Sequence, residues 1–192
     1  AVGIRLMTSG LPDLTTMKVN TALCLGALAV TLLVGSAPVI RLGSAFVIVL
    51  TLLTLVEITT GANLRIDEIL VSDHTVKHGI SPGQMAPATA VSLLALAASR
   101  LLLEGGRSRA AERLLAVPML TATMTLFGYL FGVEQLYRVT TLSSVAIHSA
   151  VCWALLTVAV ASLVPNGVLP WIASGTGPGS AVVRGTVPVV TG

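Results

Sequence analysis

The sequence predicts an all-α integral membrane protein, a bundle of about five transmembrane helices built from repeated helical hairpins. Of its 192 residues 54% are apolar and only 10% are charged, and the mean hydropathy is +0.93. A soluble domain carries about 25% charged residues, so 11 Lys+Arg and 8 Asp+Glu are too few to cover a water-soluble surface. The apolar stretches also lack the period-two alternation of barrel strands. High hydropathy with little charge excludes a disordered chain as well.

Five apolar stretches approach the length of about 20 residues that a helix needs to cross the hydrocarbon core. They cover residues 19–34, 42–60, 87–103, 114–133 and 145–164, and Pro38 closes the first. We therefore divide the chain into an outer N-terminal segment 1–18, a membrane bundle 19–164 and a tail 165–192. Within the tail, the apolar residues 182–190 are broken by Arg184 and Pro188, and we interpret them as the start of a further helix.

Basic residues between the spans predict the orientation, because cytoplasmic loops of membrane proteins carry an excess of Lys and Arg. Six arginines fall on one side of the predicted membrane: Arg41, Arg100, Arg107, Arg109, Arg113 and Arg184. We place the Arg107 turn and the C-terminal tail in the cytoplasm. Residue 1 and the loops 61–86 and 132–142 then face outward. The expected location is a bacterial inner (cytoplasmic) membrane.

Three helix starts share a sequence pattern, which indicates an internal repeat. Residues 17–22 (MKVNTA), 85–90 (MAPATA) and 145–150 (VAIHSA) are spaced by 68 and then 60 residues. Each is preceded by an outer segment that begins with glycine. Asn, Thr and Ser in these starts are expected to cap free backbone N–H groups, and Pro87 suits a first helical turn.

The motifs also resemble a known family. Residues 16–24 (TMKVNTALC), 52–57 (LLTLVE), 127–133 (FGYLFGV) and 146–150 (AIHSA) occur in the same order in a multi-helix membrane region of bacterial signalling proteins. In those proteins the region is followed by PAS, histidine-kinase or diguanylate-cyclase domains. The resemblance implies a membrane-embedded sensory or input module that works with a cytoplasmic signalling domain, although no such output domain lies within these residues. A structural accessory subunit of a larger respiratory or photosynthetic membrane complex remains the alternative.

Three polar residues within or beside the predicted spans are candidates for ligand sensing or for packing: Asn20, Glu57 and His148. Glu57 is the one acid inside a predicted span, where carboxylates are costly and often functional. It lies close to the outer boundary, so a structural side chain that reaches interfacial water is favoured. His148 could sense pH or ligate a metal, but a capping or packing role is favoured.

The sequence predicts no metal site, no cofactor and no catalysis. His74 and His78 lie four residues apart beside Asp73, but their polar stretch reads better as a solvated loop. No nucleophile–His–carboxylate set, HExxH motif or phosphate-binding loop appears. The net charge of +3 reflects basic loops rather than nucleic-acid binding.

Small residues at four-residue spacing predict close helix contacts. They are Gly128 and Gly132 in one span, and Ala146, Ala150 and Ala154 in another. We assign them first to packing within the bundle and second to a homodimer. The expected partners are the lipid bilayer and other membrane subunits or a second copy of the chain.

Overall fold

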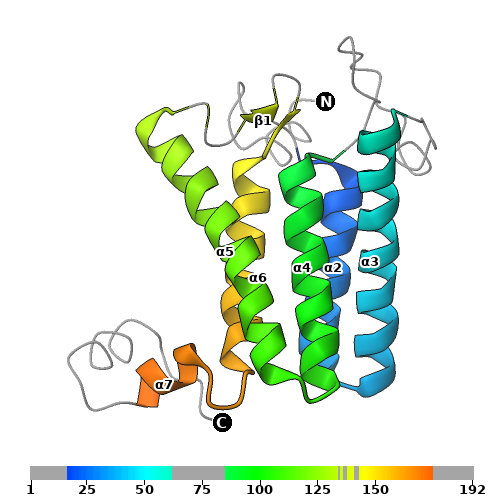
Figure 1. Cartoon of the computed structure of the whole chain (residues 1–192), viewed down its shortest axis with the longest axis vertical. Helices are drawn as coiled ribbons and strands as arrows, with labels where there is room; N and C mark the ends of the chain where they lie inside the picture. The colour runs from blue at the N-terminus through cyan, green and yellow to red at the C-terminus, as the bar shows by residue number, and fades with distance from the viewer. Residues whose placement is uncertain (1–16, 62–84, 134, 136–137, 141–142, 175–192) are drawn as a thin grey trace.

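The structure is a computed structural model that describes residues 17–61, 85–133, 135, 138–140 and 143–174. Within these ranges the chain is predominantly helical, and most of its helices lie side by side (Figure 1). A short antiparallel ribbon of β1 (Arg138–Thr140) and β2 (Ser143–Ser144) lies at the upper end of the bundle in Figure 1. The prediction of a helical chain is confirmed.

The described part of the chain contains five long helices and one short helix besides the β ribbon. They are α2 (Val19–Val34), α3 (Ala37–Thr60), α4 (Pro87–Glu104), α5 (Ser108–Phe131), α6 (Ile147–Ser162) and α7 (Val168–Ser174). The three helices α3, α4 and α5 are long and apolar enough to cross a membrane. The two apolar helices α2 and α6 have 16 residues each. Helices α2, α4 and α6 begin at the upper end in Figure 1, and α3 and α5 begin at the lower end.

The helix starts at the lower end differ from the prediction. The fourth span was expected to begin at residue 114, but α5 begins at Ser108, and α3 begins at Ala37 instead of residue 42. The hydropathy pattern ends a predicted span where charged residues begin. The helix itself continues, because its backbone hydrogen bonds also form in the charged stretch beyond the hydrocarbon. Pro38 does not only end the first span. It occupies the first turn of α3, where a missing N–H costs nothing.

Helix α4 lies at the centre and contacts α2, α3, α5 and α6. Half of its most apolar stretch is buried, compared with 28% for the corresponding stretches of α3 and α5. Many of its buried residues are small: Ala90, Ser92, Ala95, Ala97 and Ser99. Small side chains let neighbouring helices approach closely, and packing of this kind drives helix association in a membrane. Helix α4 is therefore the element around which the bundle is assembled.

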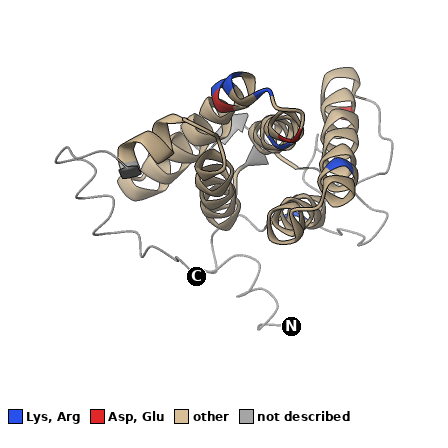
Figure 2. Ribbon diagram, turned by 90° about the horizontal axis from the view of Figure 1, so that it is seen from below, with Lys and Arg blue, Asp and Glu red and all other residues tan. Residues whose placement is uncertain are grey.

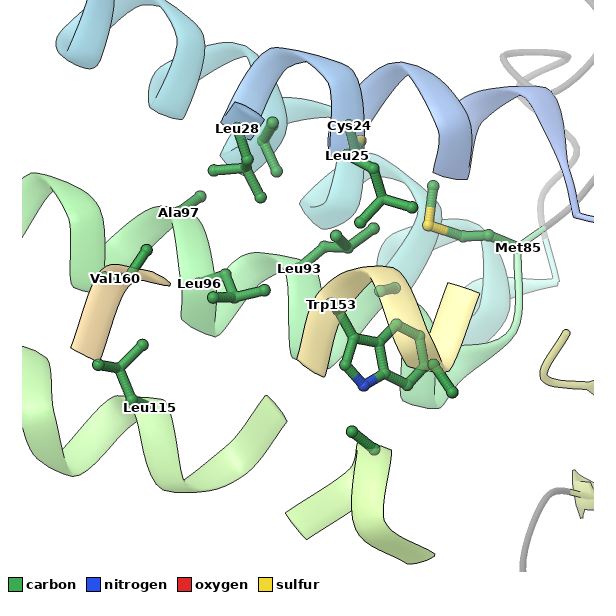
Figure 3. Close-up of a cluster of buried hydrophobic side chains, with 14 of the residues drawn as sticks. Cys24, Leu25, Leu28, Met85, Leu93, Leu96, Ala97, Leu115, Trp153 and Val160 are labelled. Carbon is green, nitrogen blue, oxygen red and sulfur yellow. The ribbon is translucent and has the colours of Figure 1, made fainter. Parts of the chain in front are cut away.

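The core is an apolar cluster to which all five long helices, α2 to α6, contribute (Figure 3). Towards the upper end, Leu25, Met85, Leu93 and Trp153 lie together, and Leu93 and Trp153 are fully buried. Large apolar side chains also cover the outward faces, such as Leu130, which is 74% exposed. Apolar residues both inside and outside are typical of a helix bundle whose solvent is lipid.

Helices α3 and α5 bury the same positions. Both have 24 residues and end in a left-handed glycine, Gly61 or Gly132, whose N–H bonds to the carbonyl four residues earlier. The residues buried in α3 are Ile40, Ser44, Val47, Thr51, Thr54 and Glu57. A shift of 71 residues turns that set into Ala111, Leu115, Pro118, Ala122, Thr125 and Gly128, which are the residues buried in α5. The two helices therefore present corresponding faces to their neighbours.

Helices α2 and α3 approach closely at Gly43, where a larger side chain would not fit without movement. A Cβ atom at Gly43 would lie 2.7 Å from Cγ2 of Thr31, whose hydroxyl donates a hydrogen bond to the Leu28 carbonyl. We expect Gly43→Ala to lower the free energy of unfolding by about 1–3 kcal/mol, because the helices must move apart. Unfolding in detergent, followed by circular dichroism, measures the change.

The matched control is Gly26→Ala, because a Cβ atom at Gly26 would meet nothing within 4 Å. The same substitution there removes only the entropic penalty of glycine in a helix, so we expect a gain of up to about 1 kcal/mol. Equal losses in both variants would contradict the close approach at Gly43.

Candidate functional site

Buried polar side chains gather within about two turns of the upper helix ends. We call this set the upper polar group, and it comprises Asn20, Thr21, Thr54, Glu57, Thr89, His148 and Ser149. All are buried except His148, which is half-buried. They come from α2, α3, α4 and α6. Buried Ser and Thr are common where membrane helices pack, but enclosed ionisable residues such as Glu57 and His148 are rare and often functional. This group is therefore the candidate site.

Side-chain capping at the N-cap positions does not explain the polar residues Thr21, Thr89 and Ser149, contrary to expectation. The N-cap residues of α2, α4 and α6 are Lys18, Ala86 and Ala146, and none makes a side-chain capping bond. Thr21, Thr89 and Ser149 instead lie inside the first turn and are buried against neighbouring helices. The expectation for Pro87 is confirmed, since it lies in the first turn of α4.

Glu57 does not reach interfacial water, contrary to the favoured expectation, because only 2% of the residue is exposed. It lies one turn before the end of α3, and its carbonyl accepts the N–H of the capping residue Gly61. Helix α3 packs against α2 and α4, so the buried face that carries Glu57 looks into the bundle. The corresponding position of α5 is Gly128. A carboxylate at such a position is expensive and gains nothing from packing alone.

His148 and Trp153 add two polar atoms to the contact of α6 with its neighbours. The His148 Nδ1 and the Trp153 Nε1 are buried, and neither has a hydrogen-bond partner within the described part of the chain. The Tyr129 hydroxyl donates a 2.6 Å bond to the Val145 carbonyl, which links α5 to the segment that leads into α6. Trp153 was not singled out from the sequence, because a lone Trp in an apolar run reads as core.

No group of three potential metal ligands lies within the described residues. Among the described side chains His148 therefore belongs to no set of three potential metal ligands. The candidates His74, His78 and Asp73 lie outside the described residues, as does the tail segment 182–190.

Hydroxyl groups connect α4 to α5 below the upper polar group. The Ser92 and Thr121 hydroxyls lie 2.6 Å apart, and the Ser99 hydroxyl donates to the Ala111 carbonyl at 3.2 Å. Each hydroxyl has one proton, so whichever of the two accepts this bond donates its own proton to a carbonyl of its helix, Ala88 for Ser92 or Val117 for Thr121. These bonds satisfy polar groups that lipid would leave unpaired, and they fix the two helices relative to each other.

Charged residues gather at the lower end, where α4 meets α5 (Figure 2). Arg41 of α3 forms a 2.6 Å ion pair with Glu104 at the end of α4. Arg100 was expected in the turn, but it lies inside α4 with 7% of the residue exposed, and its Nη2 donates to the Thr31 carbonyl. An arginine can stay buried there because its long stem lets the guanidinium approach the helix ends.

The tail is attached to α5 by a contact that the sequence analysis missed. The Glu112 Oε1 accepts the Val168 N–H at 2.6 Å at the start of α7. Gly167 makes the approach possible, since a Cβ atom there would lie 2.9 Å from Val164 side-chain atoms and 3.1 Å from Glu112 Oε1. The one feature of the sequence that could have indicated this contact is Gly167, which closely follows the predicted span 145–164.

The small-residue motifs lie mainly inside the bundle. Gly128, Ala146 and Ala150 are buried, and Ala154 is half-buried. Gly132 is exposed and ends α5 in a left-handed conformation with φ +68°, so it does not pack inside the described bundle, and its place in a homodimer contact stays a prediction. Glycine is suited to that conformation.

Comparisons with known proteins give this chain no relative. No family model matches it, and no curated protein and no solved structure matches it.

The Ser92–Thr121 hydrogen bond gives a measurable test of the contact between α4 and α5. We expect the variants Ser92→Ala and Thr121→Val to show a coupling energy of about 0.5–1.5 kcal/mol in a double-mutant cycle of unfolding in detergent. Thr123→Val is the control, because the Thr123 hydroxyl bonds only to the Met119 carbonyl of its own helix. Coupling of Ser92 to Thr123 as strong as to Thr121 would contradict the interhelical bond.

Proposed function

We propose that the chain is a membrane-embedded sensory or input module without catalytic activity of its own. The observation that carries this proposal is the upper polar group, which includes the enclosed carboxylate of Glu57. The central helix α4 contacts every other long helix and runs from this group to the charged lower end. A change in the surroundings of Glu57, Asn20 or His148 would thus reach Arg100 and Glu104 through one rigid element. The resemblance to sensory membrane regions supports the same function.

We also propose that all five long helices cross the membrane and that they arise from a repeated hairpin. The coincident buried positions of α3 and α5, at a shift of 71 residues, support the repeat. Similar support comes from α2, α4 and α6, each of which begins two residues after Met17, Met85 or Val145. Their 16–18 residues would span with the adjoining turns included.

The charge distribution supports a cytoplasmic lower end in a bacterial inner membrane. Among the described residues, five arginines and two glutamates lie at the lower end: Arg41, Arg100, Arg107, Arg109, Arg113, Glu104 and Glu112. Five minus two leaves three positive charges on this end. By the positive-inside rule it faces the cytoplasm, with the upper polar group towards the outside.

A structural accessory subunit of a larger respiratory or photosynthetic complex is the second candidate. The observation that favours it is the stacked pair of exposed rings, Phe127 and Phe131, whose centroids lie 5.8 Å apart on α5. Such a face suits another membrane subunit as well as lipid.

The orientation predicts the labelling of introduced cysteines. In a background with Cys24→Ala and Cys152→Ala, we expect Arg107→Cys to react with an impermeant maleimide only from the cytoplasmic side. Val133→Cys at the upper end, an exposed position, should react only from outside. Inverted labelling of both sites would overturn the orientation, and labelling of both from one side would overturn the number of spans.

The two candidate functions predict different partner proteins in the membrane. We expect native purification of the full chain to recover a kinase, a cyclase or another signalling protein whose activity changes in Glu57→Gln, while the amount recovered stays constant. Glutamine keeps the shape of the side chain and removes its charge, so the bundle should still assemble. Thr123→Val, a change on an exposed hydroxyl, is the control.

Two outcomes would contradict the sensory proposal. One is recovery of the chain in a fixed ratio within a large respiratory or photosynthetic complex, which would favour the accessory subunit. The other is a partner activity that Glu57→Gln leaves unchanged, which would make Glu57 a structural residue.

A further inference from the structure

We propose that the exposed face of α5 binds an anionic phospholipid, with the arginines at the lower end holding its phosphate. Arg107 precedes the helix, and Arg109 and Arg113 lie four residues apart on its first two turns. All three are exposed. Residues at a spacing of four share one face of a helix, so Arg109 and Arg113 can approach a single ligand.

The two acids nearest to these arginines are already engaged. Glu104 pairs with Arg41, and the Glu112 carboxylate accepts the Val168 N–H. Within the part of the chain that the structure describes, Arg107, Arg109 and Arg113 take part in no ion pair. The seven residues 107–113 carry three arginines and one glutamate, which leaves two positive charges on this surface available to an anion from outside the protein.

The surface beyond the arginines favours a lipid over a soluble anion or an acidic protein. The line of Arg109 and Arg113 continues at helical spacing through exposed apolar side chains: Leu120 at 63%, Met124 at 53%, Phe127 at 49% and Phe131 at 68%. The stripe is charged where α5 begins and apolar along the rest of the helix, which matches a phosphate headgroup followed by an acyl chain.

The geometry of the phosphate group fits arginine in particular. A guanidinium donates parallel hydrogen bonds to two phosphate oxygens, which a lysine ammonium does not reproduce. Because α4 ends at Glu104 and α5 begins at Ser108, the three arginines lie at the level where a spanning helix meets the headgroups. The inference uses the proposed membrane spans, but it does not depend on sensing.

Binding of phosphatidylglycerol to the full chain in a neutral detergent tests the proposal, with native mass spectrometry as the readout. We expect retention of phosphatidylglycerol and not of phosphatidylcholine. Removal of a basic residue near a membrane surface weakens binding roughly five-fold, so Arg107→Gln, Arg109→Gln and Arg113→Gln together should weaken it about a hundred-fold. Lys18→Gln is the matched control, because it removes one positive charge at the opposite end and should leave retention unchanged.

Further measurements separate the contributions of charge, guanidinium geometry and the acyl chains to lipid retention. The corresponding triple lysine variant keeps the charge and should retain less lipid than the parent chain. Glycerol 3-phosphate, which offers the phosphate without acyl chains, should compete poorly. If the triple glutamine variant does not fold, the single variants should each show the smaller loss. Unchanged retention in every arginine variant, or full competition by glycerol 3-phosphate, would overturn the lipid site. If the proposed membrane orientation is wrong, lipid retention should be unchanged, so the two proposals can fail independently.

Discussion

The close packing of four helices around α4 is the constraint on which the rest of the structure depends. In lipid there is little hydrophobic gain from bringing apolar helices together, so contact must come from shape and from interhelical hydrogen bonds. Helix α4 provides the shape through buried Ala90, Ala95 and Ala97, and it provides the hydrogen bonds through Ser92 and Ser99. Large side chains such as Leu93 and Trp153 then fill the space at the upper half of the core.

This packing decides where charge can be placed. Hydroxyl groups within the bundle are satisfied by carbonyls of their own helix, as for Thr51 and Thr157. A guanidinium or carboxylate needs more partners than one carbonyl offers, so the described charged side chains lie near helix ends. At the lower end Arg41 pairs with Glu104 and Arg100 bonds to the Thr31 carbonyl, whereas Arg107, Arg109 and Arg113 are exposed. Glu57 near the upper end is the charged side chain that is most fully enclosed.

Much of the fold could be predicted from sequence, because apolar length and helix-breaking residues are local signals. The bounds of α2 agree with the prediction, since Gly35 and Pro38 stop the helix within a few residues. The starts of α3 and α5 could not be located from hydropathy, because the helix continues through Arg41 and Arg109. The burial of Arg100 and Glu57 depends on which way each helix face turns, and hydropathy does not show that in helices that are apolar on all sides.

The site was less predictable than the fold for a related reason. The sequence indicated Asn20, Glu57 and His148 as candidates, and all three lie at the same end of the bundle. It assigned their neighbours to helix capping, because Ser and Thr near a helix start usually cap it. In a membrane bundle the same residues can turn inward instead, as Thr21, Thr89 and Ser149 do, and the choice depends on neighbouring helices.

The proposed repeat offers a way to separate scaffold from function. Two hairpins of common origin should keep the residues that packing requires and differ where one of them has acquired a task. Thr54 and Thr125 correspond, and both are buried, which is what a shared scaffold demands. Glu57 corresponds to Gly128, and Arg100, at the spacing of 60 residues, corresponds to Val160. Packing alone accepts a glycine or a valine at these positions, so it does not require the charged groups. These two charged residues are therefore departures from the repeat that packing does not explain, and they lie towards opposite ends of the bundle.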